Sequence, residues 1–239
     1  MSEFVQLWVY LSSTPLFGLT ATLVVYVAAQ AFYGRMQQAP WANPVLWSVV
    51  TLAIGLTLTG TAYPTYFSGA QFIHFLLGPA VVALAWPLWQ RRAALRARWV
   101  RFALASLAGG SAAALSASGL AWALDLPHDV LLSLVPKSVT APVAMGVAEK
   151  IGGIPALAAV FAVLTGMVGA LSGKYLFDAI GIGRDANGWM ARGFALGTAA
   201  HGIGAARALQ VNSDAGAWAA LALSLQVVFA SVLIPLVVR

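Results

Sequence analysis

Long apolar runs recur along the whole chain and are separated by short polar segments. A hydrocarbon core about 30 Å thick is spanned by about 20 helical residues, so runs of that length are candidates for membrane crossings. By this length criterion about eight runs qualify, at 14–33, 44–62, 71–89, 101–124, 131–149, 154–178, 189–210 and 215–238. The sequence therefore predicts an all-α, polytopic membrane protein with about seven or eight hydrophobic segments.

Charged residues are too few for a surface that faces water. Only 8% of the 239 residues are Asp, Glu, Lys or Arg, whereas a soluble domain carries about 25%. The 13 Lys and Arg exceed the 7 Asp and Glu, and cytoplasmic loops of membrane proteins account for such an excess. No basic stripe with interleaved aromatic residues indicates nucleic acid. We therefore expect the lipid bilayer, and no nucleic acid, to contact most of the surface.

Several kinds of chemistry lack their sequence signatures. The chain contains no cysteine, which removes disulfides, thiolate metal sites and cysteine nucleophiles together. The three histidines, His74, His128 and His201, are far apart and lack metal-ligand spacing. P-loop, Rossmann, HExxH and GxSxG motifs are absent too. We expect no enzyme activity, no cofactor and no metal site.

The loops predict the orientation of the chain. Segment 90–101 is rich in arginine and is predicted to be cytoplasmic, which puts the N-terminus outside. Segment 131–149 is short and is interrupted by Pro136 and Pro142. If this segment is re-entrant or a broken helix, the C-terminus and the last basic residues fall inside, as the charge rule favours. We expect a multi-pass protein of a bacterial inner membrane.

The whole chain, 1–239, is predicted to be one membrane domain. It divides into an N-terminal span with its cytoplasmic loop, a first repeat-like unit, and a second unit with the broken helices, at 1–43, 44–100 and 101–239. Segments 44–90 and 154–209 share a proline near the start, a polar loop and a glycine-containing end. Under the re-entrant topology they run in opposite directions, like the inverted repeats of transporters. Chance similarity between two Ala/Gly-rich segments explains these shared features equally well.

Polar and cationic residues interrupt the fifth apolar run. Pro136 and Pro142 lack N–H groups, and a proline inside a helix frees the carbonyl four residues before it. Lys137, Ser138 and Thr140 place an ammonium and two hydroxyls near the start of a helix predicted over about 138–149, where backbone N–H groups are unpaired. This cluster suits a small carboxylate. The alternative is that Lys137 reaches a lipid headgroup and the prolines only shape a loop.

A second polar cluster lies in the seventh apolar run. Thr198 and His201 are three residues apart and would share one face of a continuous helix. Glycines at 197, 202 and 204 allow a second backbone to come close. An ionisable residue at membrane depth is a functional hypothesis by default, and histidine can couple proton binding to substrate. A structural His201, hydrogen-bonded across a tight helix contact, is an equally good alternative.

Several of these runs together resemble the LrgB/CidB family. The resemblance covers about residues 43–238 and is carried by Phe75–Ala85, Pro136–Ala144, Gly152–Pro155, Leu164–Ala170 and Gly193–Gly204. Pro79, in the first of these motifs, is expected to break a helix as Pro136 does. The sequence departs from the family pattern at Ala141 and Ala205, where threonine is usual, and at Trp89, where tyrosine is usual. Because two hydroxyls are lost, substrate preference is not carried over.

The resemblance implies two different functions. One branch is similar to the plant plastidial glycolate/glycerate translocator, and related bacterial pairs are linked to pyruvate uptake. The other branch comprises antiholin-like regulators of murein hydrolase export and cell lysis, which act with a small LrgA/CidA-type membrane protein. The family also looks related to elevator-type carriers, which implies broken helices at the substrate site and a homodimer.

We therefore expect a secondary transporter of small monocarboxylates, possibly coupled to protons. Lys137, Ser138 and Thr140 are predicted to bind the anion, and Thr198 and His201 to complete the pocket. The alternative is an antiholin-like regulator of murein hydrolase export that assembles with an LrgA/CidA-type partner. A channel subunit is a third, weaker hypothesis.

Overall fold

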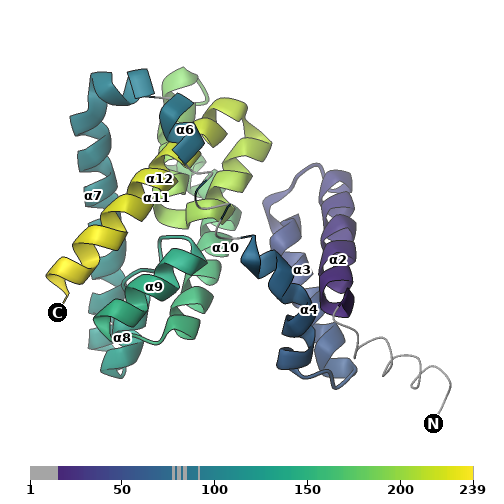
Figure 1. The fold of residues 1–239 in the computed structure, drawn as a ribbon. Helices are drawn as coiled ribbons and strands as arrows, with labels where there is room; N and C mark the ends of the chain where they lie inside the picture. Colours follow the sequence, from purple (N-terminus) through teal and green to yellow (C-terminus); the bar gives the residue numbers. More distant parts are fainter. Residues whose placement is uncertain (1–15, 77–78, 80–81, 83–84, 91, 239) are drawn as a thin grey trace, which may run out of the picture. The chain divides into compact units, whose positions relative to one another are not determined.

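The computed structural model describes residues 16–76, 79, 82, 85–90 and 92–238 (Figure 1). Helices make up all the regular secondary structure of these residues, which confirms the all-α prediction for this part of the chain. The chain divides into two compact units, Met1–Val81 and Val82–Arg239. Residues 78 and 80, the two neighbours of Pro79, lie outside the described residues, so the helix break expected there stays a prediction.

The first unit contains α2 (Leu16–Arg35), the 3-10 helix η1 (Pro40–Ala42), α3 (Pro44–Leu58) and α4 (Tyr63–Phe75). Helices α2 and α4 touch backbone to backbone, because a Cβ on Gly18 would collide with the Tyr66 carbonyl oxygen. One turn further on, Thr22 Oγ1 and the Tyr66 hydroxyl are hydrogen-bonded at 2.6 Å. Asn43 caps the start of α3: its Oδ1 accepts from the backbone N–H of Val45 at 2.9 Å, which satisfies a donor that a helix start leaves unpaired.

The second unit contains seven helices within the described residues. They are α6 (Ala85–Gln90), α7 (Arg92–Ala123), α8 (His128–Leu134), α9 (Ala141–Ile151), α10 (Pro155–Ala179), α11 (Ala186–Val211) and α12 (Ser213–Val237). Asp185 and Asn212 cap α11 and α12, accepting from the N–H groups of Gly188 and Ala215. Two helices leave helical geometry internally, α7 at Arg98 and α11 near its middle.

Four of the described helices are long and apolar enough to cross a membrane. They are Leu16–Arg35, Leu95–Ala123, Pro155–Ala179 and Ser213–Val237. On α7, Leu104, Leu115 and Trp122 are each more than 60% exposed, and such an apolar face needs lipid around it. These features support a membrane protein.

The predicted seven or eight segments do not appear as that many long apolar helices among the described residues. Segment 131–149 is divided between α8 and α9, and segment 189–210 lies in the bent helix α11. Segment 71–89 includes residues outside the described part. The re-entrant topology, the inverted repeat and the orientation of the termini stay predictions.

Small residues bring the helices of the second unit together. A Cβ on Gly193 would collide with the carbonyl oxygen of Ala215, and a Cβ on Gly197 with that of Ala219. Helices α11 and α12 therefore pack backbone to backbone, as membrane helices with small interfacial residues do. Gly197, which the sequence singled out, serves this packing.

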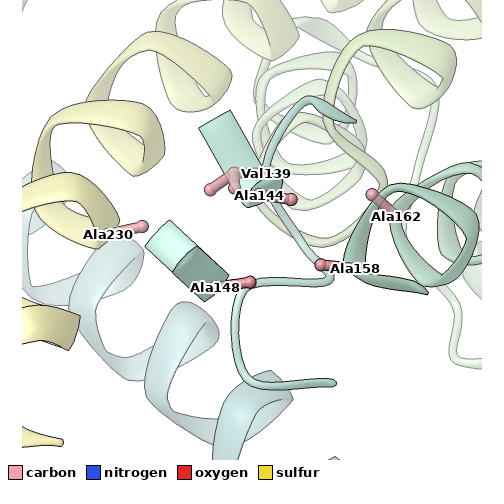
Figure 2. Close-up of a cluster of buried hydrophobic side chains, with 6 residues drawn as sticks. All are labelled: Val139, Ala144, Ala148, Ala158, Ala162 and Ala230. Carbon is pink, nitrogen blue, oxygen red and sulfur yellow. The ribbon is translucent and has the colours of Figure 1, made fainter. Parts of the chain in front are cut away.

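An alanine-rich core holds the helices around the candidate site. Figure 2 shows its side chains, which come from α9, α10, α12 and the segment before α9: Val139, Ala144, Ala148, Ala158, Ala162 and Ala230. All of these residues are at most 3% exposed. Because alanine fills little volume, the backbones of these helices lie close together.

Candidate functional site

The chain from Ser133 to Ile154 forms a closed hairpin, in which residues 135–140, here called the tip, connect the end of α8 to the start of α9. The base is closed by Ser133, whose Oγ accepts from the Ile154 N–H at 2.7 Å and donates to the Asp129 carbonyl at 2.6 Å. Ser133 and Ile154 are 21 residues apart, so the chain returns to its starting point between them. The polar segment predicted as the anion site therefore lies within this closed hairpin, between the end of α8 and the first turn of α9.

The tip is built from tight turns. The Lys137 N–H donates to the Leu134 carbonyl at 3.2 Å. Thr140 is extended (φ −59°, ψ 145°) and precedes α9, which begins at Ala141, three residues later than predicted. Pro142 lies in the first turn of α9, where its missing N–H costs nothing. Pro142 thus starts a helix rather than interrupting one.

The polar side chains of the tip have no partners among the described residues. Ser138 Oγ and Thr140 Oγ1 are buried without a hydrogen bond, and Thr140 does not cap α9. The Lys137 side chain is half-buried and forms no ion pair with a described residue. A buried hydroxyl left unpaired costs about 1–3 kcal/mol, and such groups in a native structure point to a ligand or water.

Helix α11 turns back on itself at Ala200 (φ −116°, ψ 15°) and His201 (φ 40°, ψ −135°). A Cβ on Gly204 would lie 2.8 Å from the Leu196 carbonyl oxygen. In a continuous helix these two residues would be about 12 Å apart along the axis. The argument that Thr198 and His201 share one helix face does not apply, because the turn falls between them.

His201 fixes this turn to α10. Its Nε2 lies 2.6 Å from the carbonyl oxygen of Ala162, and the residue is 3% exposed. Gly166, one turn further along α10, leaves room for the ring, since a Cβ there would lie 2.8 Å from Nε2. The cross-helix hydrogen bond that sequence analysis kept as an alternative for His201 is therefore present.

The two turns meet. A Cβ on Gly202 would lie 3.8 Å from Thr140 Cγ2, which is ordinary van der Waals contact. Thr198, on the other side of the α11 turn, carries a third buried hydroxyl without a hydrogen bond. The structure thus brings Thr140 next to Gly202 and places free hydroxyls on both turns. Within the described residues, no three His, Asp or Glu side chains could together hold a metal ion.

Sequence reasoning missed two residues that hold this arrangement. Ser133 has no local signal, because its partner Ile154 is distant in sequence. Arg192 is 5% exposed and pairs with Asp178 at 2.6 Å. It also donates to the carbonyls of Ile182 and Gly183, so it clamps the connection between α10 and α11. The only hints in the sequence were an acid near the end of one helix and two arginines, Arg192 and Arg207, in the next apolar helix.

Known proteins resemble this chain over most of its length. The sequence model of the family described as LrgB-like matches residues 22–239. The Bacillus subtilis protein YxaC is 33% identical over 217 residues, which cover 91% of this chain and 92% of that protein. YwbG of the same organism is 35% identical over 198 residues, covering 83% and 86%. A Staphylococcus aureus protein named holin-like protein CidB is 31% identical over 221 residues, covering 91% and 93%. No solved structure matches.

Proposed function

The chain belongs to the LrgB-like family, and on this premise we propose that it is a secondary carrier for small monocarboxylates such as glycolate, glycerate or pyruvate. The observation that carries the proposal is that three of the four buried hydroxyls without a partner among the described residues, those of Ser138, Thr140 and Thr198, lie on or beside the two turns; the fourth belongs to Ser106 on α7. Hydroxyls that donate to a carboxylate form charge-assisted hydrogen bonds, which are about twice as strong as neutral ones. A carboxylate is therefore the ligand that would satisfy them best.

Lys137 supplies the charge that such an anion needs. Its ammonium has no ion pair with a described residue, so it is available to a ligand. A cation at membrane depth is costly unless it is paired, and a substrate carboxylate would pair it. Lys137 and the three hydroxyls together form the proposed binding set.

Alternating access is proposed to use the two turns as one moving part. The hairpin α8–α9 and the bent helix α11 both pack on α10, through Ala158 and Ala162 on one side and Gly166 on the other. Movement of these elements against the remaining helices would expose the site to each side in turn, as in carriers with discontinuous helices. His201 holds the α11 turn and is the candidate for a coupled proton. A homodimer in a bacterial inner membrane is part of the same proposal.

Uptake of labelled glycolate, glycerate and pyruvate into proteoliposomes tests the carrier. We expect saturable flux that Lys137→Ala abolishes while the protein still folds. Thr140→Val and Thr198→Val keep the side-chain shape but remove one hydroxyl each. Loss of a hydrogen bond to a charged ligand costs about 1.5–3 kcal/mol, so KM rises about 10- to 100-fold.

The thermal stability of the same variants is the internal control. Because these hydroxyls have no partner among the residues that the structure describes, replacing them by methyl groups should leave the melting temperature unchanged or raise it. Ser172→Ala is the matched control for transport, since Ser172 is exposed and, among the described residues, donates to the Val168 carbonyl alone. If intact protein gives no flux of the labelled carboxylates even with an LrgA/CidA-type partner added, the carrier proposal is wrong.

The second candidate function is antiholin-like regulation of murein hydrolase export. The Staphylococcus aureus relative named holin-like protein CidB favours it. In this reading the chain acts by assembling with an LrgA/CidA-type partner, and the three hydroxyls have no ligand to bind. Lysis timing in cells should then be unaffected by Thr140→Val or Thr198→Val. A channel subunit differs from both in giving flux that does not saturate at millimolar substrate.

A further inference from the structure

A groove of about 480 Å³ lies between α7 and α11 in the second unit. Two contacts fix the relative direction of these helices. Phe102 stacks on Phe194 with ring centroids 5.3 Å apart, and a Cβ on Gly109 would lie 2.9 Å from Thr198 Cγ2. Residue numbers therefore rise in the same direction along both walls, so the groove has one end near Phe102 and the other at Thr198.

The first end carries two arginines. Arg98 and Arg101 line the groove, are exposed, and form no ion pair with a described residue. They belong to the arginine-rich segment 90–101, which the sequence predicts to lie in the cytoplasm. At 1.5 Å per residue, about 16 Å of helix separates Arg98 from Gly109.

The second end is the free hydroxyl of Thr198. This residue lines the groove and is 5% exposed, and its Oγ1 has no hydrogen-bond partner. Thr198 lies two residues before the turn at Ala200 and His201. Between the two ends the walls are apolar, formed by Phe102, Phe194 and alanines, so nothing along the way competes for an anion.

We propose that this groove is the path by which a small carboxylate reaches the helix turns, and that Arg98 and Arg101 gather the anion at its mouth. The inference rests on the proposed carrier function and adds its entry route. Cations around a cleft with low-dielectric walls raise the local concentration of anions and their association rate about 10- to 1000-fold. A groove of about 480 Å³ falls within the range of about 300–1,000 Å³ typical of small-molecule sites, so a small carboxylate fits in it.

An anionic lipid offers the same chemistry from another source. Its headgroup would sit on Arg98 and Arg101 and its acyl chain along the phenylalanine walls. In that case the groove is dry, whereas an access path is wet. Accessibility to a water-soluble anionic reagent separates the two.

The natural absence of cysteine makes this measurement direct. Ala195→Cys places a single thiol in the groove wall, and Leu104→Cys places one on α7, at a residue that is 61% exposed and outside the groove. Both are treated in proteoliposomes with the anionic reagent methanethiosulfonate ethylsulfonate, present on both membrane faces. We expect Ala195→Cys to react at least about 10-fold faster than Leu104→Cys. Equal rates would overturn the proposal in favour of a lipid-filled groove.

The arginines are tested in the same background. Arg98→Gln and Arg101→Gln should slow labelling of Ala195→Cys about 10-fold at low salt and raise the KM for uptake while leaving Vmax unchanged. Arg96→Gln is the matched control, because Arg96 is exposed on the same helix and does not line the groove. If the effect of the arginines follows the anionic lipid content of the vesicles rather than the ionic strength, they bind lipid and the proposal is wrong.

Failure of the groove and failure of the carrier give different results. Saturable uptake with equal labelling of Ala195→Cys and Leu104→Cys leaves the carrier intact and removes the groove as its route. Selective, arginine-dependent labelling without any uptake keeps the groove as an anion path and removes the carrier.

Discussion

Replacing Gly166 with alanine puts one methyl group against the ring of His201. The added Cβ would lie 2.8 Å from both Cε1 and Nε2 of the ring and 2.9 Å from Ile203 Cβ. Because these separations are shorter than normal contact distances, the ring must move away from the Ala162 carbonyl oxygen, to which it is hydrogen-bonded at 2.6 Å. The substitution therefore tests whether His201 holds the turn on α10.

The energetic cost follows from three effects. Overpacking a tight contact costs about 1–3 kcal/mol, and the broken hydrogen bond leaves buried polar groups unpaired at about 1–3 kcal/mol. Alanine recovers about 0.5–1 kcal/mol relative to glycine inside a helix. The net destabilisation is about 3 kcal/mol, which for a chain of this size lowers the melting temperature by about 6–12 °C.

Thermal unfolding in detergent, followed by intrinsic fluorescence, measures the effect. Gly146→Ala in α9 is the matched control, because it is also helical but has nothing within 4 Å of its added Cβ. The control should melt at or slightly above the wild-type temperature. If Gly166→Ala does the same, the ring of His201 does not lie on Gly166, and the contact between α10 and the α11 turn is refuted.

Two further substitutions test the other elements that hold the site. Ser133→Ala removes the acceptor of the Ile154 N–H and should destabilise by about 1–3 kcal/mol; unchanged exchange of the Ile154 amide with deuterium would contradict the closed hairpin base. Arg192→Lys keeps the charge but loses the planar fork, so it should lower the melting temperature more than Arg184→Lys, although both arginines pair with Asp178. Equal effects in a fluorescence melt would show that Arg192 acts only through its charge.

The parts of the site with a local chemical cause could be predicted from sequence. Pro136 and Pro142 flank the polar segment, and proline excludes a continuous helix through it. Hydroxyls and an ammonium in an apolar run are equally visible, so Lys137, Ser138 and Thr140 stood out without a structure. The start of α9 was predicted three residues too early, because the turn before it is held by backbone hydrogen bonds, which have no signature in the residue types.

The turn in α11 could not be predicted in the same way. No proline marks it, and the positive φ falls on His201 although Gly202, which tolerates it better, follows directly. The conformation is sustained by contacts with α10, above all the bond to Ala162. Hydropathy also cannot separate a helix that crosses a membrane from one that folds back, so segment counting gave more spans than the described helices provide.

Polar residues around the two turns fall into two groups, one that stabilises the folded chain and one that destabilises it. His201, Ser133 and Arg192 are bonded within the chain, and stability alone explains them. The hydroxyls of Ser138, Thr140 and Thr198 have no hydrogen-bond partner within the described part of the chain, and each lowers stability by about 1–3 kcal/mol. A bound anion that accepts hydrogen bonds from all three hydroxyls would recover this lost stability. Because hydrogen bonds to a charged acceptor are stronger than those to a neutral one, the three hydroxyls would also favour a charged ligand over a neutral ligand. A pure assembly partner has no use for this arrangement. Hydroxyl-to-methyl substitutions that raise stability while removing uptake would therefore separate the carrier from the regulator more sharply than loss of Lys137, which either function could need for folding.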